Sequence, residues 1–136
     1  MGNWILGMAL ALASFGAIAQ ESAETKRWYL LTETASDTKV YADSKTVRRS
    51  GDMVTVWLKY VYKVPKIRGG QSVYSTLDMV KFDCTQSTSQ QLSSSNYGDP
   101  ANGQVLQTHS TPGPVEPIVP GSVGEDLSDT ICQIGK

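Results

Sequence analysis

The chain carries few side chains of the types that perform catalysis, and their spacing matches no known catalytic pattern. Its single histidine, His109, lies in or just after a polar strand, where a solvated residue is expected more often than a general base. Nucleophilic catalysis would need a Ser or Cys next to a base that is itself oriented. Ser122 stands in Gly121-Ser122-Val123-Gly124, which is not the G-x-S-x-G pattern of a nucleophile elbow. We therefore interpret His109 as a solvent-exposed strand residue and predict no catalytic residue and no enzymatic activity.

Metal and cofactor binding are poorly supported as well, because the cysteines are better explained by a disulfide and carboxylates are then the main ligands that remain. Asp126 and Asp129 are three residues apart, and we interpret them as the solvated face of a helix. A calcium site at this pair and haem ligation through His109 are the alternatives. We therefore predict that the protein binds no metal ion and no cofactor.

The two cysteines, Cys84 and Cys132, are an even number in a chain that begins with an export signal, and this favours a disulfide. Only one intramolecular pairing exists, and the alternative is two buried free thiols. In the chain-entropy account, a disulfide that closes so long a loop stabilises the fold by about 4 kcal/mol.

The export signal occupies residues 1–19. Residues 4–18 are apolar or small without a charge, and Ala17-Ile18-Ala19 is a cleavage signature, although residues 2–5 lack Lys and Arg. We expect the mature chain to begin at Gln20, residues 20–26 to be a flexible lead and residues 27–136 to be one domain. An uncleaved anchor is the alternative. No later apolar run reaches the ~20 residues of a membrane helix, so we expect a soluble mature chain. Without a cysteine near the cut, no lipid anchor is expected.

Basic side chains are concentrated in one part of the sequence. Residues 26–81 hold 11 Lys and Arg against 5 Asp and Glu, whereas residues 82–136 hold Lys136 against six acidic residues. We predict a ligand-binding outer sheet face made by Trp57, Lys59, Lys63, Lys66, Arg68, Arg48 and Arg49. Such a face would meet an acidic glycan, lipopolysaccharide or an acidic partner. The alternative is a solvated face whose lysines protect a sheet edge. The net charge of -1 and the export signal argue against nucleic acid.

Alternation of apolar and polar residues predicts about six antiparallel strands, at residues 27–32, 39–43, 52–64, 71–84, 85–97 and 104–111. Pro65 is expected to end the third of these. The apolar phase slips between Leu77 and Val80, which predicts a bulge or sharp twist. Prolines then punctuate residues 112–120, which should form neither helix nor inner strand.

A C-terminal helix is predicted from Ser122 onward. Ser122 and Glu125 fit a capping box, and Val123, Leu127, Ile131 and Ile134 follow at helical spacing. Cys132 lies beside this apolar stripe, so the helix can pack on the sheet and be tethered there through Cys84. Strands followed by one helix are typical of an α+β fold.

These residues, in this order, resemble the surface-adhesin protein E-like family of exported bacterial proteins. The resemblance rests on Trp28, Val40-Tyr41-Ala42-Asp43, Val47-Arg48, the strand from Val54 to Tyr60, Gly69-Gly70, Tyr74-Ser75, Phe82-Asp83-Cys84, Pro117-Ile118-Val119-Pro120-Gly121-Ser122 and Cys132. It implies a six-stranded antiparallel sheet whose concave face holds the C-terminal helix, tethered by the disulfide. It also implies adhesion to host matrix and plasma glycoproteins, with haem as a proposed ligand. The chain departs from the family in having Val115 where an aromatic residue is common, and in lacking an anchoring cysteine.

Our leading hypothesis is a non-enzymatic binding module of a bacterial envelope, periplasmic, secreted or at the cell surface, which holds a matrix glycoprotein or polyanion on its basic outer face. The alternative is a structural or accessory envelope protein that pairs an edge strand with a partner protein or with a second copy of itself.

Overall fold

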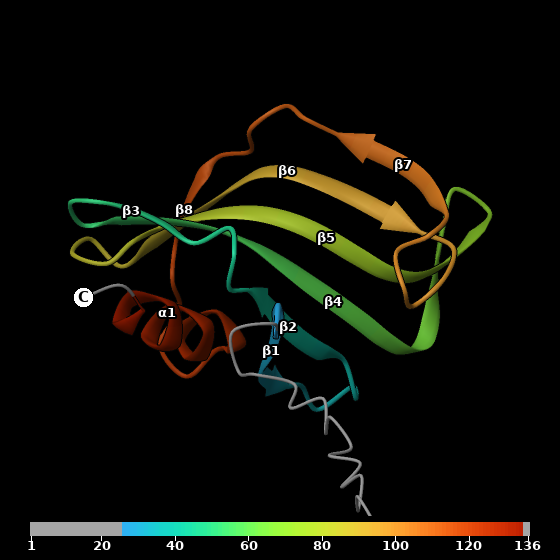
Figure 1. The fold of residues 1–136 in the computed structure, drawn as a ribbon, viewed down its shortest axis with the longest axis horizontal. Helices are drawn as coiled ribbons and strands as arrows, with labels where there is room; N and C mark the ends of the chain where they lie inside the picture. Colours follow the sequence, from blue (N-terminus) through green and yellow to red (C-terminus); the bar gives the residue numbers. More distant parts are fainter. Residues whose placement is uncertain (1–25, 135–136) are drawn as a thin grey trace, which may run out of the picture.

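The computed structural model describes residues 26–134, which form one antiparallel sheet followed by one helix (Figure 1). The strands are β1 (Trp28–Glu33), β2 (Lys39–Asp43), β3 (Arg48–Ser50), β4 (Met53–Arg68), β5 (Gln71–Asp83), β6 (Thr88–Tyr97), β7 (Val105–His109) and β8 (Val115–Pro117), and the helix is α1 (Val123–Gln133). The order of strands first and helix last is the predicted α+β arrangement. The predicted signal and lead, residues 1–25, lie outside the described residues.

In the described part of the chain the sheet has eight strands rather than about six. Six of them follow the order β1-β2-β4-β5-β6-β7, β3 pairs with β4, and β8 pairs with β6. The two additional strands are short: β3 is Arg48–Ser50 and β8 is Val115–Pro117. Runs of three residues are too short to show a period of two, which is why periodicity missed them. β8 lies in the proline-rich stretch and pairs only with β6, where proline is tolerated.

Strand β4 continues through Pro65, so the prediction that this proline ends the strand was wrong. The register with β5 shifts between Val61, which lies opposite Ser75, and Lys66, which lies opposite Val73. Four residues of β4 therefore face Tyr74 alone. Because proline cannot donate to a ladder, it fits such an irregularity without breaking the strand. The hairpin then closes at Gly69 and Gly70, both of which have positive φ, the backbone conformation that glycine adopts most readily.

The predicted slip of phase near the end of β5 corresponds to an irregularity in the sheet. Met79 lies opposite Ser93 and Val80 opposite Gln91, so that Leu92 of β6 is the extra residue. Within β5, Val73 and Ser75 are buried before the slip and Val80 and Phe82 after it. The bulged strand is β6, whereas β5 keeps its alternation, with Thr76, Val80 and Phe82 on one face. The slip of apolar phase in the sequence of β5 arises because Val73 and Ser75 are buried on the opposite face.

The core lies between α1 and the sheet. Leu127 and Ile131 belong to one buried cluster with strand residues, namely Val40, Ala42, Val54, Val56, Leu58, Val80 and Phe82. We call the side of the sheet that carries this cluster the helix side and the opposite side the outer face. Figure 1 shows α1 next to β1, and α1 also contacts β5.

A capping box, a disulfide and a hydrogen bond from Arg49 fix the two ends of α1. Ser122 is the N-cap residue, whose hydroxyl accepts from the Glu125 N–H at 3.2 Å, while the Glu125 carboxylate accepts from the Gly121 N–H at 3.3 Å. The predicted disulfide between Cys84 and Cys132 is confirmed and ties the last turn of α1 to the end of β5. Arg49 adds a hydrogen bond of 2.6 Å from its Nη2 to the carbonyl oxygen of Cys132.

Candidate functional site

Aromatic and basic side chains meet on the outer face of the sheet. Trp57 and Lys59 alternate with the buried Val56 and Leu58 of β4, so their side chains point away from the helix side. Lys59 Nζ lies 4.6 Å from the ring centroid of Trp28 and 5.3 Å from that of Tyr41. We call Trp28, Tyr41, Trp57 and Lys59 the Trp–Lys cluster. Strands β1, β2 and β4 are neighbours in the sheet, which is why residues distant in sequence come together here.

The Trp–Lys cluster borders a shallow cavity and an ion pair. Trp28 and Trp57 both line a cavity of about 180 Å³, with Tyr97 from β6 on its rim. Arg27 donates to the buried carboxylate of Asp43 at 2.7 Å, and this bond together with the charge of Asp43 raises the pKa of Arg27. Burial lowers the pKa of Lys59. The cluster thus presents half-buried rings around a partly desolvated cation, an arrangement that strengthens cation–π attraction.

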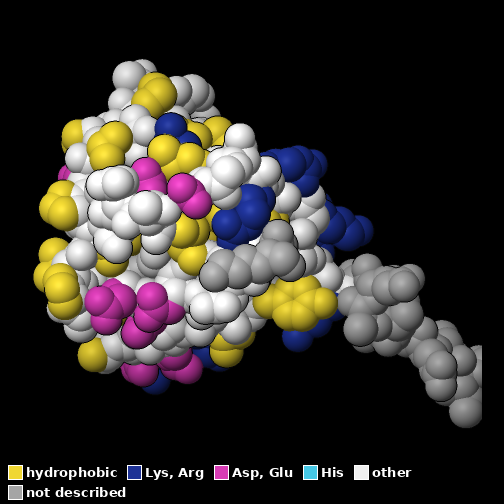
Figure 2. Space-filling view, turned by 90° about the vertical axis from the view of Figure 1, so that its left-hand side faces the viewer, with side chains coloured by type: hydrophobic (Ala, Val, Ile, Leu, Met, Phe, Trp, Pro, Cys, Tyr) yellow, Lys and Arg dark blue, Asp and Glu magenta, His cyan; other side chains and the backbone are white. Residues whose placement is uncertain are grey.

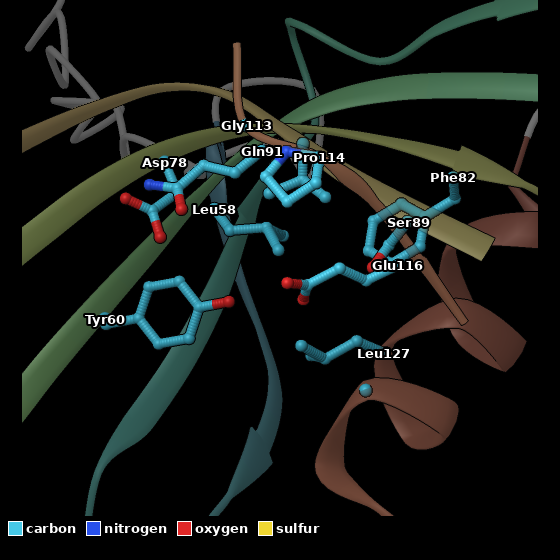
Figure 3. Close-up of a pocket in the computed structure, with 12 residues that line it drawn as sticks. Leu58, Tyr60, Asp78, Phe82, Ser89, Gln91, Gly113, Pro114, Glu116 and Leu127 are labelled. Carbon is cyan, nitrogen blue, oxygen red and sulfur yellow. The ribbon is translucent and has the colours of Figure 1, made fainter. Parts of the chain in front are cut away.

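A second candidate site lies on the helix side, beyond the cover of α1. Three adjoining cavities of about 240, 440 and 460 Å³ all include Gln91 in their lining, so they form one continuous trough. We define the helix-side trough by Tyr60, Lys66, Arg68, Asp78, Gln91 and Ser94. Figure 3 shows the end of the trough nearest the helix, where Tyr60 and Glu116 point toward each other and Leu127 closes the base.

Hydrogen bonds order the floor of the helix-side trough. Tyr62 Oη donates to Thr76 Oγ1 at 3.0 Å, and Thr76 Oγ1 donates to Asn96 Oδ1 at 3.2 Å. Ser94 Oγ donates to Asp78 Oδ1 at 2.6 Å. These side chains come from β4, β5 and β6, which are consecutive in the sheet. Their orientation is set before any ligand arrives, which lowers the ordering cost of binding.

Burial shapes the ionisation of two groups in the trough. It raises the pKa of Asp78, an effect that the Ser94 hydrogen bond and the charge of Arg68 oppose. Burial also raises the pKa of Tyr60 well above its ordinary value, and the nearby Asp78 carboxylate adds to the shift. Tyr60 is therefore a neutral hydroxyl at physiological pH and can donate one hydrogen bond into the trough.

The structure divides the predicted binding residues among four places. Trp57 and Lys59 lie in the Trp–Lys cluster, whereas Lys66 and Arg68 line the helix-side trough. The irregularity between Val61 and Lys66 separates them, because the side-chain alternation does not carry across it.

The three remaining basic residues take part in local contacts. Lys63 pairs with Asp37 at 3.3 Å beside a separate cavity. Arg49 donates hydrogen bonds to backbone carbonyl oxygens at the end of α1. Arg48 Nη1 donates to the backbone carbonyl oxygens of Lys45 and Val47. Figure 2 shows most acidic side chains grouped on one half of the visible face and most basic ones on the other.

Sequence reasoning missed several residues of both candidate sites. Trp28 and Tyr41 were not among the predicted binding residues and were named with the family resemblance. An aromatic residue on each of two strands that pair with each other is a signal that could have indicated a surface cluster. Nothing in the local pattern marked Tyr60, Asp78 or Gln91. His109 lies exposed at the end of β7, on the margin of the helix-side trough. Among residues 26–134 no three His, Cys, Asp or Glu side chains are grouped so that they could hold a metal ion.

An antiparallel sheet followed by a disulfide-tied C-terminal helix defines a small α+β class of protein. Residues 28–133 match the family described as surface-adhesin protein E, and the chain belongs to that family. No curated protein sequence matches the chain. The helices of residues 26–134 include none long and apolar enough to cross a membrane.

Solved structures of protein E from Haemophilus influenzae share the fold. The selenomethionine form has a TM-score of 0.61 at 9% sequence identity, covering 79% of this chain and 87% of that chain. A second crystal form has a TM-score of 0.57 at 14% identity, with the same coverage of 79% and 87%. Protein E from a non-typeable strain has a TM-score of 0.54 at 14% identity, covering 79% and 76%. At these identities the likeness concerns the fold.

Proposed function

We propose that this protein is a non-enzymatic, exported, adhesin-like module that holds an acidic glycan or a matrix glycoprotein on the Trp–Lys cluster. The observation that carries the proposal is Lys59 Nζ held 4.6 Å from the Trp28 ring on the outer face of the sheet. Membership of the surface-adhesin protein E family supports an adhesive rather than a catalytic role. In this arrangement the helix occupies the concave side of the sheet and leaves the outer face for the ligand.

The chemistry of the Trp–Lys cluster suits a sugar that carries negative charge. Tryptophan and tyrosine rings offer flat apolar surface that can stack on the C–H face of a pyranose. The Trp N–H and Tyr O–H groups can at the same time hydrogen-bond to water or to sugar hydroxyls. Lys59 supplies the cation for a carboxylate or sulfate, and Arg27 lies 5.7 Å from the Trp28 ring centroid on the same rim. Because Arg27 is already paired with Asp43, Lys59 is the principal charge for a ligand.

Residues 1–19 serve in this proposal as a signal peptide that delivers the chain to the periplasm, the medium or the cell surface. The partner is then a host matrix or plasma glycoprotein, or an acidic glycan, and nucleic acid is not a ligand. The mature chain acts as a soluble domain rather than a membrane-spanning one.

Lys59→Ser, alone and with Trp57→Ala, tests the proposal, with binding of the mature chain to immobilised heparin measured across a salt series. We expect about a tenfold or larger loss of affinity, because a partly desolvated charge contact disappears. Lys63→Ser is the matched control, since it removes the same charge from the same strand at a place outside the cluster. Equal binding by wild type and Lys59→Ser, with the loss confined to Lys63→Ser, would contradict the site.

A second candidate function is association through a free sheet edge. Strands β1 and β7 end the strand path, and each carries an exposed apolar side chain, Leu30 at 52% and Val105 at 58% exposed. Such an edge can take a strand from a partner protein or from a second copy of the chain. This mode depends on main-chain hydrogen bonds, so capture that persists at high salt and in Lys59→Ser would favour it over the Trp–Lys cluster.

A further inference from the structure

The helix-side trough has an apolar end and a polar end. Near the helix its accessible apolar surface comes from Pro114 and the ring of Tyr60, whereas Leu58, Phe82 and Leu127 in the same lining are buried in the core. Polar atoms of Ser89, Gln91 and Glu116 surround this end (Figure 3). Farther along β4 and β6, hydroxyl and amide side chains replace the aliphatic ones, with Thr76, Ser94 and Asn96 on the floor. A ligand that fits both ends must combine one small apolar group with many hydroxyl groups.

The charged groups of the trough form no direct ion pair within residues 26–134, although Arg68 and Asp78 attract each other across it. Residues 26–134 contain two ion pairs, Arg27–Asp43 and Lys63–Asp37, and neither involves a residue of the trough. Lys66 Nζ lies over the Tyr62 ring at 4.5 Å, which orients that cation without neutralising it. Asp78 receives a hydrogen bond from Ser94 and remains a strong acceptor.

The size of the trough favours a short oligomer over a single compact molecule. Its three cavities, of about 240, 440 and 460 Å³, adjoin one another along the strands. Single small-molecule sites have volumes of about 300–1,000 Å³. The two larger cavities fall in this range and the smallest falls below it, so together they accommodate consecutive units of one chain.

We propose that the helix-side trough binds a short oligosaccharide of N-acetylated amino sugars. An acetamido methyl group would lie over Pro114 and the ring of Tyr60, with its amide paired to Gln91 and Tyr60, while sugar hydroxyls meet Asp78 and Ser94. Tyr60 is a neutral donor and Asp78 an acceptor, the complementary pair that a sugar hydroxyl or amide requires. This site differs in face, residues and ligand from the Trp–Lys cluster.

Titration of the ¹⁵N-labelled mature chain with N,N′,N″-triacetylchitotriose tests the proposal by NMR. We expect saturable shifts at the amides of Tyr60, Asp78 and Gln91 at concentrations up to about 10 mM, the range of weak glycan binding. Cellotriose has the same linkage without acetamido groups and should bind about tenfold more weakly, which corresponds to the loss of one or two hydrogen bonds and a buried methyl. Absence of shifts, or equal binding of cellotriose, overturns the proposal.

Two variants separate this site from the Trp–Lys cluster. Gln91→Ala should weaken chitotriose about tenfold while leaving heparin binding intact, and Lys59→Ser should do the reverse. Gln91 is exposed, so its replacement keeps the fold, which an unchanged spectrum away from the trough would verify. Shifts that map to Trp57 and Lys59 instead of the trough would assign the sugar to the outer face and overturn the proposal.

Discussion

The helix side has two contrasting halves, one built with strands β4 and β5 and the other with β4, β5 and β6. Under α1 they present Leu58, Val80 and Phe82, which pack with Leu127 and Ile131 in a buried aliphatic cluster. Beyond the helix they present Tyr60, Asp78 and Ser94, which line the trough. The change occurs within two residues along β4, from Leu58 to Tyr60. The boundary of the helix, rather than any break in the sheet, divides the two halves.

This difference separates stability from binding. Burying an aliphatic side chain stabilises the fold by about 1.5–3 kcal/mol, whereas a hydrogen bond exchanged with water contributes about 1 kcal/mol. The covered half therefore carries most of the stability, and the polar half can change its side chains at smaller cost. A fold held together at one end of its sheet leaves the other end free to meet ligands.

Loss of the disulfide is expected to change the free energy of unfolding the most, because the disulfide ties α1 to the sheet. Reduction, or Cys84→Ser, should lower the free energy of unfolding by about 4 kcal/mol, since the closed loop limits the unfolded chain. Urea denaturation of the mature chain with and without reductant measures this. The double variant with Cys84→Ser and Cys132→Ser is the control and should not respond to reductant. If the urea midpoint of the wild type were the same with and without reductant, the disulfide would not contribute to the stability of the covered half.

Matched truncations on the two halves come next in size. Leu127→Ala should cost about 2–4 kcal/mol, because Leu127 is 4% exposed within the buried cluster. Thr76→Val removes the hydroxyl that joins Tyr62 to Asn96 and should cost about 1 kcal/mol. Chemical denaturation of both variants gives the comparison. Equal losses would remove the distinction between a stabilising half and a binding half.

The smallest effect is expected at Asp78 and depends on pH. Burial raises the pKa of this carboxyl above its unfolded value of about 3.9, so ionising it in the folded protein opposes folding. Its contribution to stability is complete below the unfolded pKa and is lost as pH rises through the folded pKa. Asp78→Asn should raise the free energy of unfolding at neutral pH and leave it unchanged near pH 3.

Urea denaturation of Asp78→Asn and wild type at the two pH values tests this sign. Ser94→Ala is the control, because it removes the hydrogen bond that lowers the pKa of Asp78 and should steepen the fall in stability with rising pH. Destabilisation of Asp78→Asn at neutral pH would instead mean that the Ser94 and Arg68 interactions outweigh burial.

Most of the fold was predictable from local patterns, and the misses have physical causes. The strand at residues 39–43 was predicted with its observed bounds, since a run of alternating residues ends there at a turn built on Asp43. The strand through Pro65 extended past its predicted end, because a proline within a bulge needs no ladder partner. Strands of three residues, such as β3, gain their structure from a neighbour and carry no period of their own.

The sequence by itself determined the six longer strands, the C-terminal helix with its Ser122 cap, and the single possible pairing of Cys84 with Cys132. These depend on side-chain period, local hydrogen bonding and cysteine count, which are properties of short segments or of composition. Only the tertiary structure decided that Trp28 meets Lys59 and that Lys66 and Arg68 leave the outer face for the trough. Strand order and register create those neighbourhoods, and a shift of register transfers side chains to the opposite face of a sheet.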